Sequence, residues 1–595
     1  MAFYWKNDQL YAKQAPTLAK EEQTENWTTF LLDLREPMDM LDMDKFSSFL
    51  AQSLGFTGNL CDVTVYLDHH RLLNINKKIR GSRPMTIPKT MDTTSPQKMF
   101  KLKAVDLQSV QMVVSRWTHE AHTTEKAFLK TASGNLDVKV SEKDALEMER
   151  TTKKRPPSQT TLQLLYVGHD ETGAPAGSKT VFKDLLPFPE QGRIFIGFPT
   201  HQTTGFCGHV AGRFIPTVER ESLDFVDKTL QVWNHELLSI AGLLSRMIYE
   251  DELVQIGNLY NEIMLSRPNS DATVDESTAR AIEMLESCVL SALKAFQLHP
   301  STPSPLVGSY IDTYFFEMST SGLSVLSSHG VMELNKVRIP DRTMSAFLEN
   351  LPVLPIPVYL GSYDFMDKLE KAGRVQRISF RDVLEELNNR TLTATQMVAM
   401  LQWWMEAKYV VSDADTKAFF QTALVSSGNS VRPLSTFKWF VTPAQGLVSM
   451  PLPPETLPHD VTKAFKVPEL LEISSVWQEL NLHEWSMFIV KKQDFETAPE
   501  FAEKVLLVLS RGWGQVPEAS QKAIVALLAI KKCIPTRHGM KLPKETYLKT
   551  VTLFSDLPVM TFNEQPVDKL LIAMGARQVR QHPYLHFQCI TMNEL

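Results

Sequence analysis

Cysteine is scarce in this sequence of 595 residues, and the few cysteines show no pairing pattern. The five cysteines lie far apart, no two have the CxxC spacing of a zinc or redox motif, and their number is odd. Free thiols in a reducing compartment are the simplest interpretation. Lys6 and Asp8 lie near the N-terminus, at the positions where a secretory signal peptide needs an apolar core. No apolar run approaches the roughly 20 residues that are needed to span a bilayer. We therefore expect a cytoplasmic protein that does not enter a membrane.

Net charge is also small. The formal value of −6 over the whole chain argues against a dedicated nucleic-acid-binding protein, whose domain would normally be basic. Apolar residues make up 43% and charged residues 22%, which is typical of a globular protein and not of a disordered one. A chain of this length is too long for a single core, so about three or four domains are expected.

The common catalytic motifs are missing from the sequence. It contains no GxxxxGK[ST] phosphate loop, no GxGxxG, no GxSxG and no HExxH. The two close glycines of "RGWGQVPEA" (511–519) are interpreted as a turn between helices. Ser291 and Lys294 form an SxxK pair, but they lie in an amphipathic helical pattern, where chance spacing is the better explanation. We therefore assign no catalytic residue and no metal ligand.

Alternating strand and helix patterns predict an α+β multidomain protein. Residues 1–76 form a first part, with a strand at 26–37 and a helix at 44–56. Residues 77–94 are rich in lysine and arginine and are expected to be a basic linker. Residues 95–265 form an α+β domain with an inserted polar loop at 131–160, and apolar residues at spacings of three and four predict a helix over 230–248. A separate helix is expected at 252–265.

The second half begins with a helical connector at 266–300, which includes a helix at 275–296. The proline-rich "LHPSTPSP" (298–305) then separates it from a mixed α+β domain at 301–460, with strands expected at "SYIDTYFFEM" (309–318) and in "LPVLPIPVYLG" (351–361). Residues 461–595 contain helices at 501–511 and 518–532, a turn at "CIPTRHGMKLP" (533–543) and a strand at "VTLF". Three helices and a β-ribbon suit a winged-helix-like unit. No repeat of fixed period stands out.

The stretch "FIGFPTHQTTGFCGHVAGRFIPTVERESLDFVD" (195–227) concentrates polar chemistry between an apolar strand and the long helix. His201, Cys207 and His209 are three soft ligands within nine residues, but their spacing is irregular and a fourth zinc ligand is not evident. Four acids precede the helix, where its dipole favours them, and the last two are candidate N-caps: Glu219, Glu221, Asp224 and Asp227.

Two arginines flank a proline-bent segment of the same stretch. An arginine placed in this way can reach an anionic group that another domain holds, because its guanidinium presents a planar fork of donors. Arg213 and Arg220 are therefore candidates for contact with a phosphate in trans. Alone they do not form a nucleotide pocket.

Two segments resemble a known family. "FPTHQTTGFCGHVAGRFIPTVERE" resembles a segment of sacsin-like proteins, and "MAFYWKNDQLYAK" with "WTTFLLDLREP" resembles the closing strands of their nucleotide domain. These proteins belong to the ATPase superfamily of gyrase, the ninety-kilodalton heat-shock chaperone and the sensor histidine kinases. The resemblance is greatest to a group of large fungal proteins of this type, and it extends more loosely over most of the chain.

The resemblance implies a histidine-kinase-like ATPase domain that is only partly present. The family's Asp-x-Gly-x-Gly turn is missing, so residues 1–76 would be the last part of that domain and the chain an N-terminally truncated form. ATP and Mg²⁺ are then cofactors of the complete protein, and we expect neither to bind tightly here. Thr28 or Thr29 would lie beside the phosphates, Lys6 at the edge of the lid, and Arg213 or Arg220 would sense the phosphate from the transducer-like domain at 95–265.

The expected function is to couple nucleotide state to the binding of protein clients or partners, without ATP hydrolysis by this chain. The main alternative is a non-enzymatic interaction scaffold that binds protein or nucleic acid through the C-terminal winged-helix-like unit. A third hypothesis is a metal-dependent hydrolase built on His201, Cys207, His209 and nearby acids.

Overall fold

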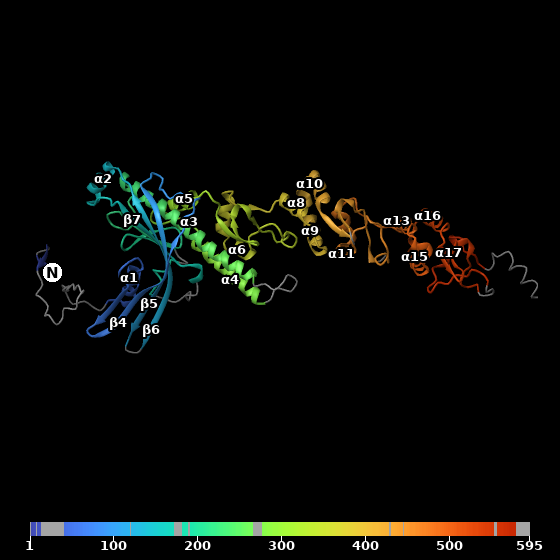
Figure 1. Cartoon of the computed structure of the whole chain (residues 1–595), viewed down its shortest axis with the longest axis horizontal. Coiled ribbons are helices and arrows are strands. Elements are labelled where there is room, and N and C mark those ends of the chain that lie inside the picture. Colours follow the sequence, from blue (N-terminus) through green and yellow to red (C-terminus); the bar gives the residue numbers. More distant parts are fainter. Residues whose placement is uncertain are drawn as a thin grey trace, which may run out of the picture. The chain divides into compact units, whose positions relative to one another are not determined.

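The computed structural model describes residues 2–6, 9–13, 41–118, 121–171, 181–187, 191–265, 276–427, 430–443, 446–551 and 556–578. The chain forms two compact units (Figure 1). Unit 1 comprises Met1–Leu326, Gly330–Asn335 and Pro357–Ala372, and unit 2 comprises Ser327–His329, Lys336–Ile356 and Gly373–Leu595. Both contain helices and strands, so the general expectation of a multidomain α+β protein is confirmed.

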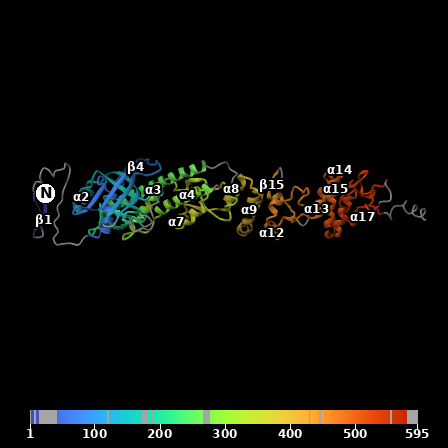
Figure 2. The same ribbon diagram turned by 90° about the horizontal axis from the view of Figure 1, so that it is seen from below.

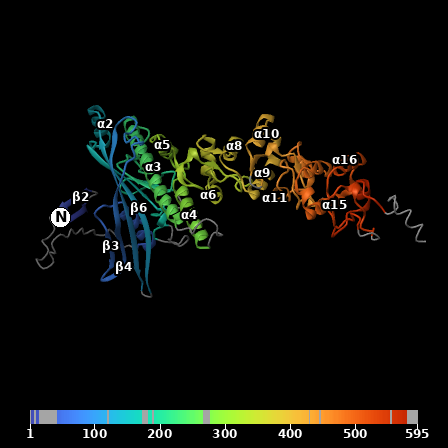
Figure 3. The same ribbon diagram turned by 45° about the vertical axis from the view of Figure 1, so that its right-hand side comes forward.

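Unit 1 is built on an eight-stranded sheet with the order β3-β4-β5-β6-β7-β10-β8-β9. Neighbouring strands are antiparallel except β10 and β8, which run parallel. Figure 3 shows β3, β4 and β6 in the half of the sheet that contains its longest strands, β4 to β6. The bounds are β3 (Asp62–Leu67), β4 (His70–Met85), β5 (Phe100–Trp117), β6 (His122–Val138), β7 (Gln159–Tyr166), β8 (Arg193–Phe195), β9 (Pro199–Thr203) and β10 (Gly208–Ala211).

One face of the sheet carries α1 (Met43–Gly55). Ala51 and Leu54 of this helix pack on buried aliphatic side chains of β4 to β7, because alternate strand residues point to the same face. The helix begins at Asp42, whose carboxylate accepts the backbone N–H groups of Asp44 and Lys45. It ends under the ammonium of Lys77, which donates to three backbone carbonyls at 2.7–3.1 Å.

The other face is covered by α3 (Lys228–Leu265), which contacts β5, β6 and β7. The helices α4 (Glu276–Ala295) and α5 (Pro305–Glu317) pack against α3 in turn. Figure 1 labels all three helices, and Figure 2 shows α4 near α3 in a second view. Every residue from Leu237 to Tyr249 is buried, because the helix has the sheet on one side and α5 on another. The backbones of α3 and α5 come close at Gly242, where an added Cβ would lie 2.7 Å from the carbonyl oxygen of Ile311.

Several predicted boundaries in unit 1 are wrong. Residues 77–85 are not a linker but the second half of β4, whose cations lie on a largely exposed strand, where lysine and arginine are common. The loop expected at 131–160 contains the end of β6, α2 (Glu142–Thr152) and the start of β7. Only Ala145 and Met148 of α2 are buried, so its composition is that of a loop. The sheet therefore crosses the expected domain boundary near residue 76.

The helices were predicted more accurately, with two exceptions. The pattern at 230–248 and the helix expected at 252–265 form the single helix α3, and Asp227 caps it by accepting from the backbone N–H groups of Thr229 and Leu230. The helix expected at 275–296 is α4, which belongs to unit 1 and is not a separate connector. The strand expected at 309–318 is wrong, since this segment is α5, whose Val307, Ile311 and Phe315 are buried at helical spacing.

Among the described residues, a hairpin followed by a 3-10 turn and then by a residue in parallel bridges occurs three times. The hairpins are β11 (Ser324–Ser327) with β12 (Gly330–Glu333), β15 (Leu424–Ser427) with β16 (Ser430–Pro433), and β19 (Ile534–Thr536) with β20 (Gly539–Lys541). The 3-10 turns are Leu334–Lys336, Leu434–Thr436 and Pro543–Glu545. We call these copies 1, 2 and 3. Gly330 and Gly539 begin the second strand of their hairpins with positive φ, which glycine adopts without strain.

The backbone hydrogen bonds of the three copies match. A central residue lies after each 3-10 turn, and these residues, Arg338, Trp439 and Tyr547, are about 100 residues apart. Each donates its N–H to the carbonyl of Pro352, Glu455 or Pro558 and accepts from the N–H of Leu354, Leu457 or Met560. Each also forms a second parallel bridge, to Gln376, Gln478 or Arg577. Because these bonds involve only the backbone, the copies share little sequence, and no period was recognised.

Helices lie between the copies. The bounds are α6 (Ile356–Gly361) and α7 (Tyr363–Lys371) after β13 (Arg338–Ile339); α8 (Phe380–Asn389), α9 (Ala394–Ala407) and α10 (Asp413–Thr422) after β14 (Gln376–Arg377); α11 (His459–Thr462) and α12 (Val467–Ile473) after β17 (Trp439–Phe440); α13 (Leu482–Ile489), α14 (Asp494–Thr497), α15 (Pro499–Gly512) and α16 (Glu518–Leu528) after β18 (Gln478–Glu479); and α17 (Asp568–Ala573).

The boundary expected near residue 460 falls within unit 2. The turn expected at 533–543 is the hairpin β19–β20, and most of "VTLF" lies outside the described residues. The strand expected in 351–361 is found only as a single parallel bridge between Val353 and Arg338. Residues 356–361 are instead helical, with a proline in the first turn of the helix.

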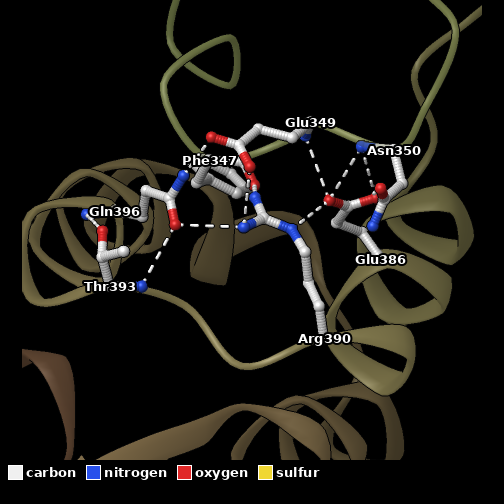
Figure 4. Close-up of polar contacts among 7 residues, drawn as sticks. All are labelled: Phe347, Glu349, Asn350, Glu386, Arg390, Thr393 and Gln396. Atoms are coloured by element: carbon white, nitrogen blue, oxygen red, sulfur yellow. Dashed lines mark hydrogen bonds and ion pairs between the residues drawn. The ribbon is translucent and has the colours of Figure 1, made fainter. Parts of the chain in front are cut away.

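In unit 2, a buried carboxylate on α8 holds the loop that follows copy 1 (Figure 4). Glu386 accepts the backbone N–H groups of Glu349 and Asn350 at 3.0–3.2 Å and the guanidinium of Arg390 at 2.6 Å. Arg390 also donates to the carbonyl of Phe347. This polar cluster stands beside an apolar core to which α8, α9 and α10 contribute.

Candidate functional site

A polar hollow of about 770 Å³ lies on the sheet of unit 1, partly below the end of α1. Its lining comes from β5, β6, β7 and β10 and from the turns that follow α1, β8 and β10. Most of its side chains are polar. The lining residues are Phe56, Lys103, Asn135, Leu136, Asp137, Gln159, Thr160, Thr161, Gln163, Gly197, Ala211, Gly212 and Arg213.

The strand register explains why these side chains meet. Asn135 is opposite Thr161, and Gln163 is opposite Ala211, so these side chains share a face of the sheet. The apolar cluster beneath α1 covers that face nearer to β4 and β5. Beyond α1, toward β7 and β10, the same face carries amides and hydroxyls in place of aliphatic groups. The hollow is therefore the part of this face that α1 does not cover.

Arg213 is the cation of the hollow that remains available. The ammonium of Lys103 lies 3.2 Å from Asp137, and together with Gln159 it lowers the pKa of that carboxyl. The exposed guanidinium of Arg213, by contrast, makes no hydrogen bond or ion pair with any residue that the structure describes. Its fork of donors, in a hollow that Thr161 and Asn135 also line, is suited to an anion such as a phosphate or a carboxylate.

The backbone at Arg213 is fixed to the beginning of α3. The indole N–H of Trp233 donates to the carbonyl of Arg213 at 2.8 Å. One residue further along α3, the amide of Asn234 accepts from the N–H of Ile215 and donates to the carbonyls of Ile215 and Asp224, all at 2.8–2.9 Å. Trp233 and Asn234 are buried. The backbone around Arg213 is therefore hydrogen-bonded to the first turns of α3.

Arg220, the other candidate arginine, has a different environment. It lies in an exposed turn with a positive φ of 60° and donates its backbone N–H to Thr217. Its guanidinium lies 5.6 Å from the ring centre of Phe198, a cation–π contact, and the residue does not line the hollow. The structure thus separates two arginines that the sequence left equivalent.

The other residues predicted at a nucleotide site are not brought to the hollow by any described contact. Lys6 lies at the end of β1 (Ala2–Lys6), opposite Gln9 of β2 (Gln9–Lys13), and among the described strands this hairpin pairs with no other. Thr28 and Thr29, with the strand expected at 26–37, lie outside the described residues.

The structure does not assemble a metal site from His201, Cys207 and His209. His201 is exposed, whereas Cys207 is buried and its thiol pKa is raised to about 12 by that burial. Both ring nitrogens of His209 are used: Nδ1 accepts from the N–H of Arg193 at 2.8 Å, and Nε2 donates to the carbonyl of Leu185 at 3.1 Å. Burial lowers the pKa of His209 to about 4, so the ring is neutral and structural.

A buried ionic cluster beneath α3 was not predicted. Glu252 of α3 accepts from Lys130 at 2.9 Å, from the hydroxyl of Tyr166 at 3.0 Å, and from the backbone and ring of His169 at 2.9 and 2.5 Å. Lys130 also lies 2.6 Å from Asp170. The one signal for it in the sequence is Lys130, which directly follows the apolar residues 127–129 of β6, and the loop expected at 131–160 begins at the next position.

Lysine and histidine side chains stabilise the buried carboxylate of this cluster. Burial opposes the ionisation of Glu252, but the hydrogen bond from His169 and the charge of Lys130 outweigh it and lower the pKa to about 2. Burial also disfavours the charged form of Lys130, yet Glu252 and Asp170 raise its pKa. His169, Asp170 and Glu252 come close enough to hold a cation, but the ammonium of Lys130 already lies against both carboxylates. The cluster therefore joins α3 to β6 and β7.

Comparison with known families identifies the chain. The sequence model of a family described as "Protein of unknown function (DUF3684)" matches residues 54–127 and 115–586. The chain belongs to this DUF3684 family. No curated protein and no solved structure matches it. The DUF3684 match includes the eight-stranded sheet, Arg213 and the three hairpin copies. Among the described residues, no helix combines the length and apolar character needed to cross a bilayer.

Proposed function

We propose that the chain is the coupling portion of a sacsin-like, chaperone-type ATPase and does not itself hydrolyse ATP. Arg213 contacts a phosphate that another domain holds, and α3 transmits that contact to the rest of unit 1. ATP and Mg²⁺ belong to the complete protein, and the binding of protein clients or partners is the output.

One observation carries this proposal: the exposed guanidinium of Arg213 stands in a polar hollow while its backbone is bonded to Trp233 of α3. A ligand that binds Arg213 better in one arrangement of this segment than in another would shift the equilibrium between the two. The resemblance of the surrounding segment to sacsin-like proteins supports a phosphate as the ligand. The odd number and wide spacing of the cysteines favour a cytoplasmic location.

Calorimetric titration of the full chain with Mg²⁺–ATP tests the absence of an autonomous nucleotide site. We expect no affinity tighter than about 1 mM, which corresponds to about 4 kcal/mol, because the hollow offers one unpaired cation and no adenine pocket is identified among the described residues. Micromolar affinity together with phosphate release would contradict the proposal. The same titration with the Arg213→Gln chain is the matched control for any weak heat that the wild-type chain gives.

A second function is favoured by the three matching hairpin copies. Copies 2 and 3 each follow a set of helices, α8 to α10 and α13 to α16, which is the element order of a winged-helix-like unit. Tandem units of one kind are typical of interaction scaffolds. We propose that unit 2 binds a protein or a nucleic acid through the hairpins of copies 2 and 3 and the helices that precede them. Hydrogen exchange with the partner bound should then show protection within residues 373–578, and protection confined to unit 1 would contradict this assignment.

A further inference from the structure

The hairpin of copy 3 is much more basic than the equivalent hairpins. Residues 531–545, which contain β19, β20 and the 3-10 turn, include five cations and one acid. The equivalent residues 321–336 of copy 1 contain one cation and one acid, and residues 421–436 of copy 2 contain a single cation. The five cations are Lys531, Lys532, Arg537, Lys541 and Lys544.

The fold does not use most of these charges. Lys531 is paired with Glu496 at 3.0 Å. The side chains of the other four make no hydrogen bond or ion pair with the residues that the structure describes, and Lys532, Arg537 and Lys544 are exposed. Copies 1 and 2 form the same hairpin with the same backbone bonds and without these cations. A concentration of unpaired positive charge that the fold does not need indicates a polyanionic partner.

Nucleic acid is the polyanion that fits best. The strands of this hairpin are three residues long, so they extend over only roughly 10 Å. Arg537 lies in the turn between them and Lys541 ends β20, while Lys532 and Lys544 lie within three residues of the open end of the hairpin. A nucleic-acid duplex offers about one negative charge per 1.7 Å of its axis, which matches such a concentration. The chain as a whole carries a net charge of −6, so attraction of a duplex must be local and not a property of the entire surface.

We propose that the β19–β20 hairpin binds the phosphate backbone of a double-stranded nucleic acid through Lys532, Arg537, Lys541 and Lys544. This inference rests on the second proposed function and names its partner. Contacts to phosphates carry no sequence information, so affinity should vary little among duplex sequences. If each cation neutralises one phosphate, the logarithm of the association constant falls with the logarithm of salt concentration with a slope of about −3.6.

The test is fluorescence anisotropy of labelled DNA and RNA duplexes of about 20 base pairs with the full chain, between roughly 50 and 200 mM salt. The slope above predicts a loss of affinity of roughly 150-fold over this range. The hairpin variant replaces four cations by glutamine: Lys532→Gln, Arg537→Gln, Lys541→Gln and Lys544→Gln. The control removes the same charge from exposed residues elsewhere in unit 2: Arg342→Gln, Lys417→Gln, Lys438→Gln and Lys504→Gln. Circular dichroism confirms that both variants fold.

We expect the hairpin variant to bind at least about tenfold more weakly at low salt, with most of the salt dependence lost, while the control stays near wild type. Equal effects of the two variants, or no binding of either duplex, would overturn the inference. Binding of polyglutamate in place of the duplexes would also overturn it, but would leave unit 2 as a protein-binding scaffold. Hydrogen exchange separates the proposals further: protection in unit 2 outside residues 531–545 overturns only the hairpin assignment, whereas protection confined to unit 1 overturns the scaffold as well.

Discussion

The replacement Glu252→Gln tests whether the buried ionic cluster fastens α3 to the sheet. The pKa of Glu252 is lowered from an ordinary value near 4.5 to about 2, which corresponds to about 3 kcal/mol in favour of the folded protein at neutral pH. Breaking a buried ion pair by removing one partner generally costs about 3–5 kcal/mol, so the two arguments agree. We therefore expect the glutamine variant to lose about 3 kcal/mol of the free energy of unfolding of unit 1 at pH 7.

Hydrogen exchange is the appropriate assay, because a two-unit chain does not have a single unfolding transition. Peptides from β6, β7 and α3 should exchange roughly 150-fold faster in the variant, since each 1.36 kcal/mol is a factor of ten. The matched control is Asp170→Asn. Its side chain is 53% exposed, so less than about 1 kcal/mol should be lost.

The pH dependence of this variant has a definite sign. Because the folded pKa of Glu252 is depressed, its contribution is present above about pH 4.5 and is lost as the pH falls toward 2. The difference between wild type and variant should therefore shrink in acid. A variant whose exchange stays within a factor of about five of wild type at pH 7 would refute the reasoning and would leave the cluster open to a role other than fastening.

Three further predictions concern other buried contacts. The pKa of His209 is held at about 4, so between pH 6.5 and 4 only the unfolded chain takes up a proton at this residue. The free energy of unfolding of unit 1 should therefore fall by up to about 3 kcal/mol over this range. In thermal unfolding, the His209→Gln variant should show a weaker dependence of stability on pH than the wild-type chain. Gly242→Ala should destabilise α3 by about 1–3 kcal/mol, because the added Cβ would press against α5. Gly257→Ala should instead stabilise α3 by up to about 1 kcal/mol, because its added Cβ would lie 3.4 Å from the nearest atoms. The midpoints of denaturant unfolding measure both effects. Glu386→Gln should cost unit 2 about 3 kcal/mol, measured by exchange in α8, against less than about 0.5 kcal/mol for the exposed Glu385→Gln.

Local patterns in the sequence predicted local structure. The apolar spacing of Leu230, Trp233 and Leu237 identified α3, and one of the two candidate N-caps, Asp227, is the residue that caps it, because helix periodicity and capping depend on near neighbours. The same reasoning failed where composition and structure disagree. Lysine and arginine at 77–85 suggested a linker, although a strand with an exposed face tolerates them, and aromatic residues at 309–318 suggested a strand, although they pack a helix against α3.

Contacts between distant residues could not be predicted in this way. Lys130 and Glu252 are 122 residues apart, and only the packing of α3 on the sheet brings them together. The hollow around Arg213 likewise depends on the register of β6, β7 and β10. Arg213 was among the candidates because its residue type and loop suggested an anion contact, but its distinction from Arg220 required the bond from Trp233 and the cation–π contact to Phe198.

The central claim is that an anion bound at Arg213 changes the stability of the first turns of α3. The most direct measurement is hydrogen exchange of the first turns of α3, residues 228–237, with and without tripolyphosphate as the probe at about millimolar concentration. We predict that tripolyphosphate slows this exchange in the wild-type chain and in Arg220→Gln, and leaves it unchanged in Arg213→Gln. An absent response in the wild-type chain, or an equal response in Arg213→Gln, would contradict the claim.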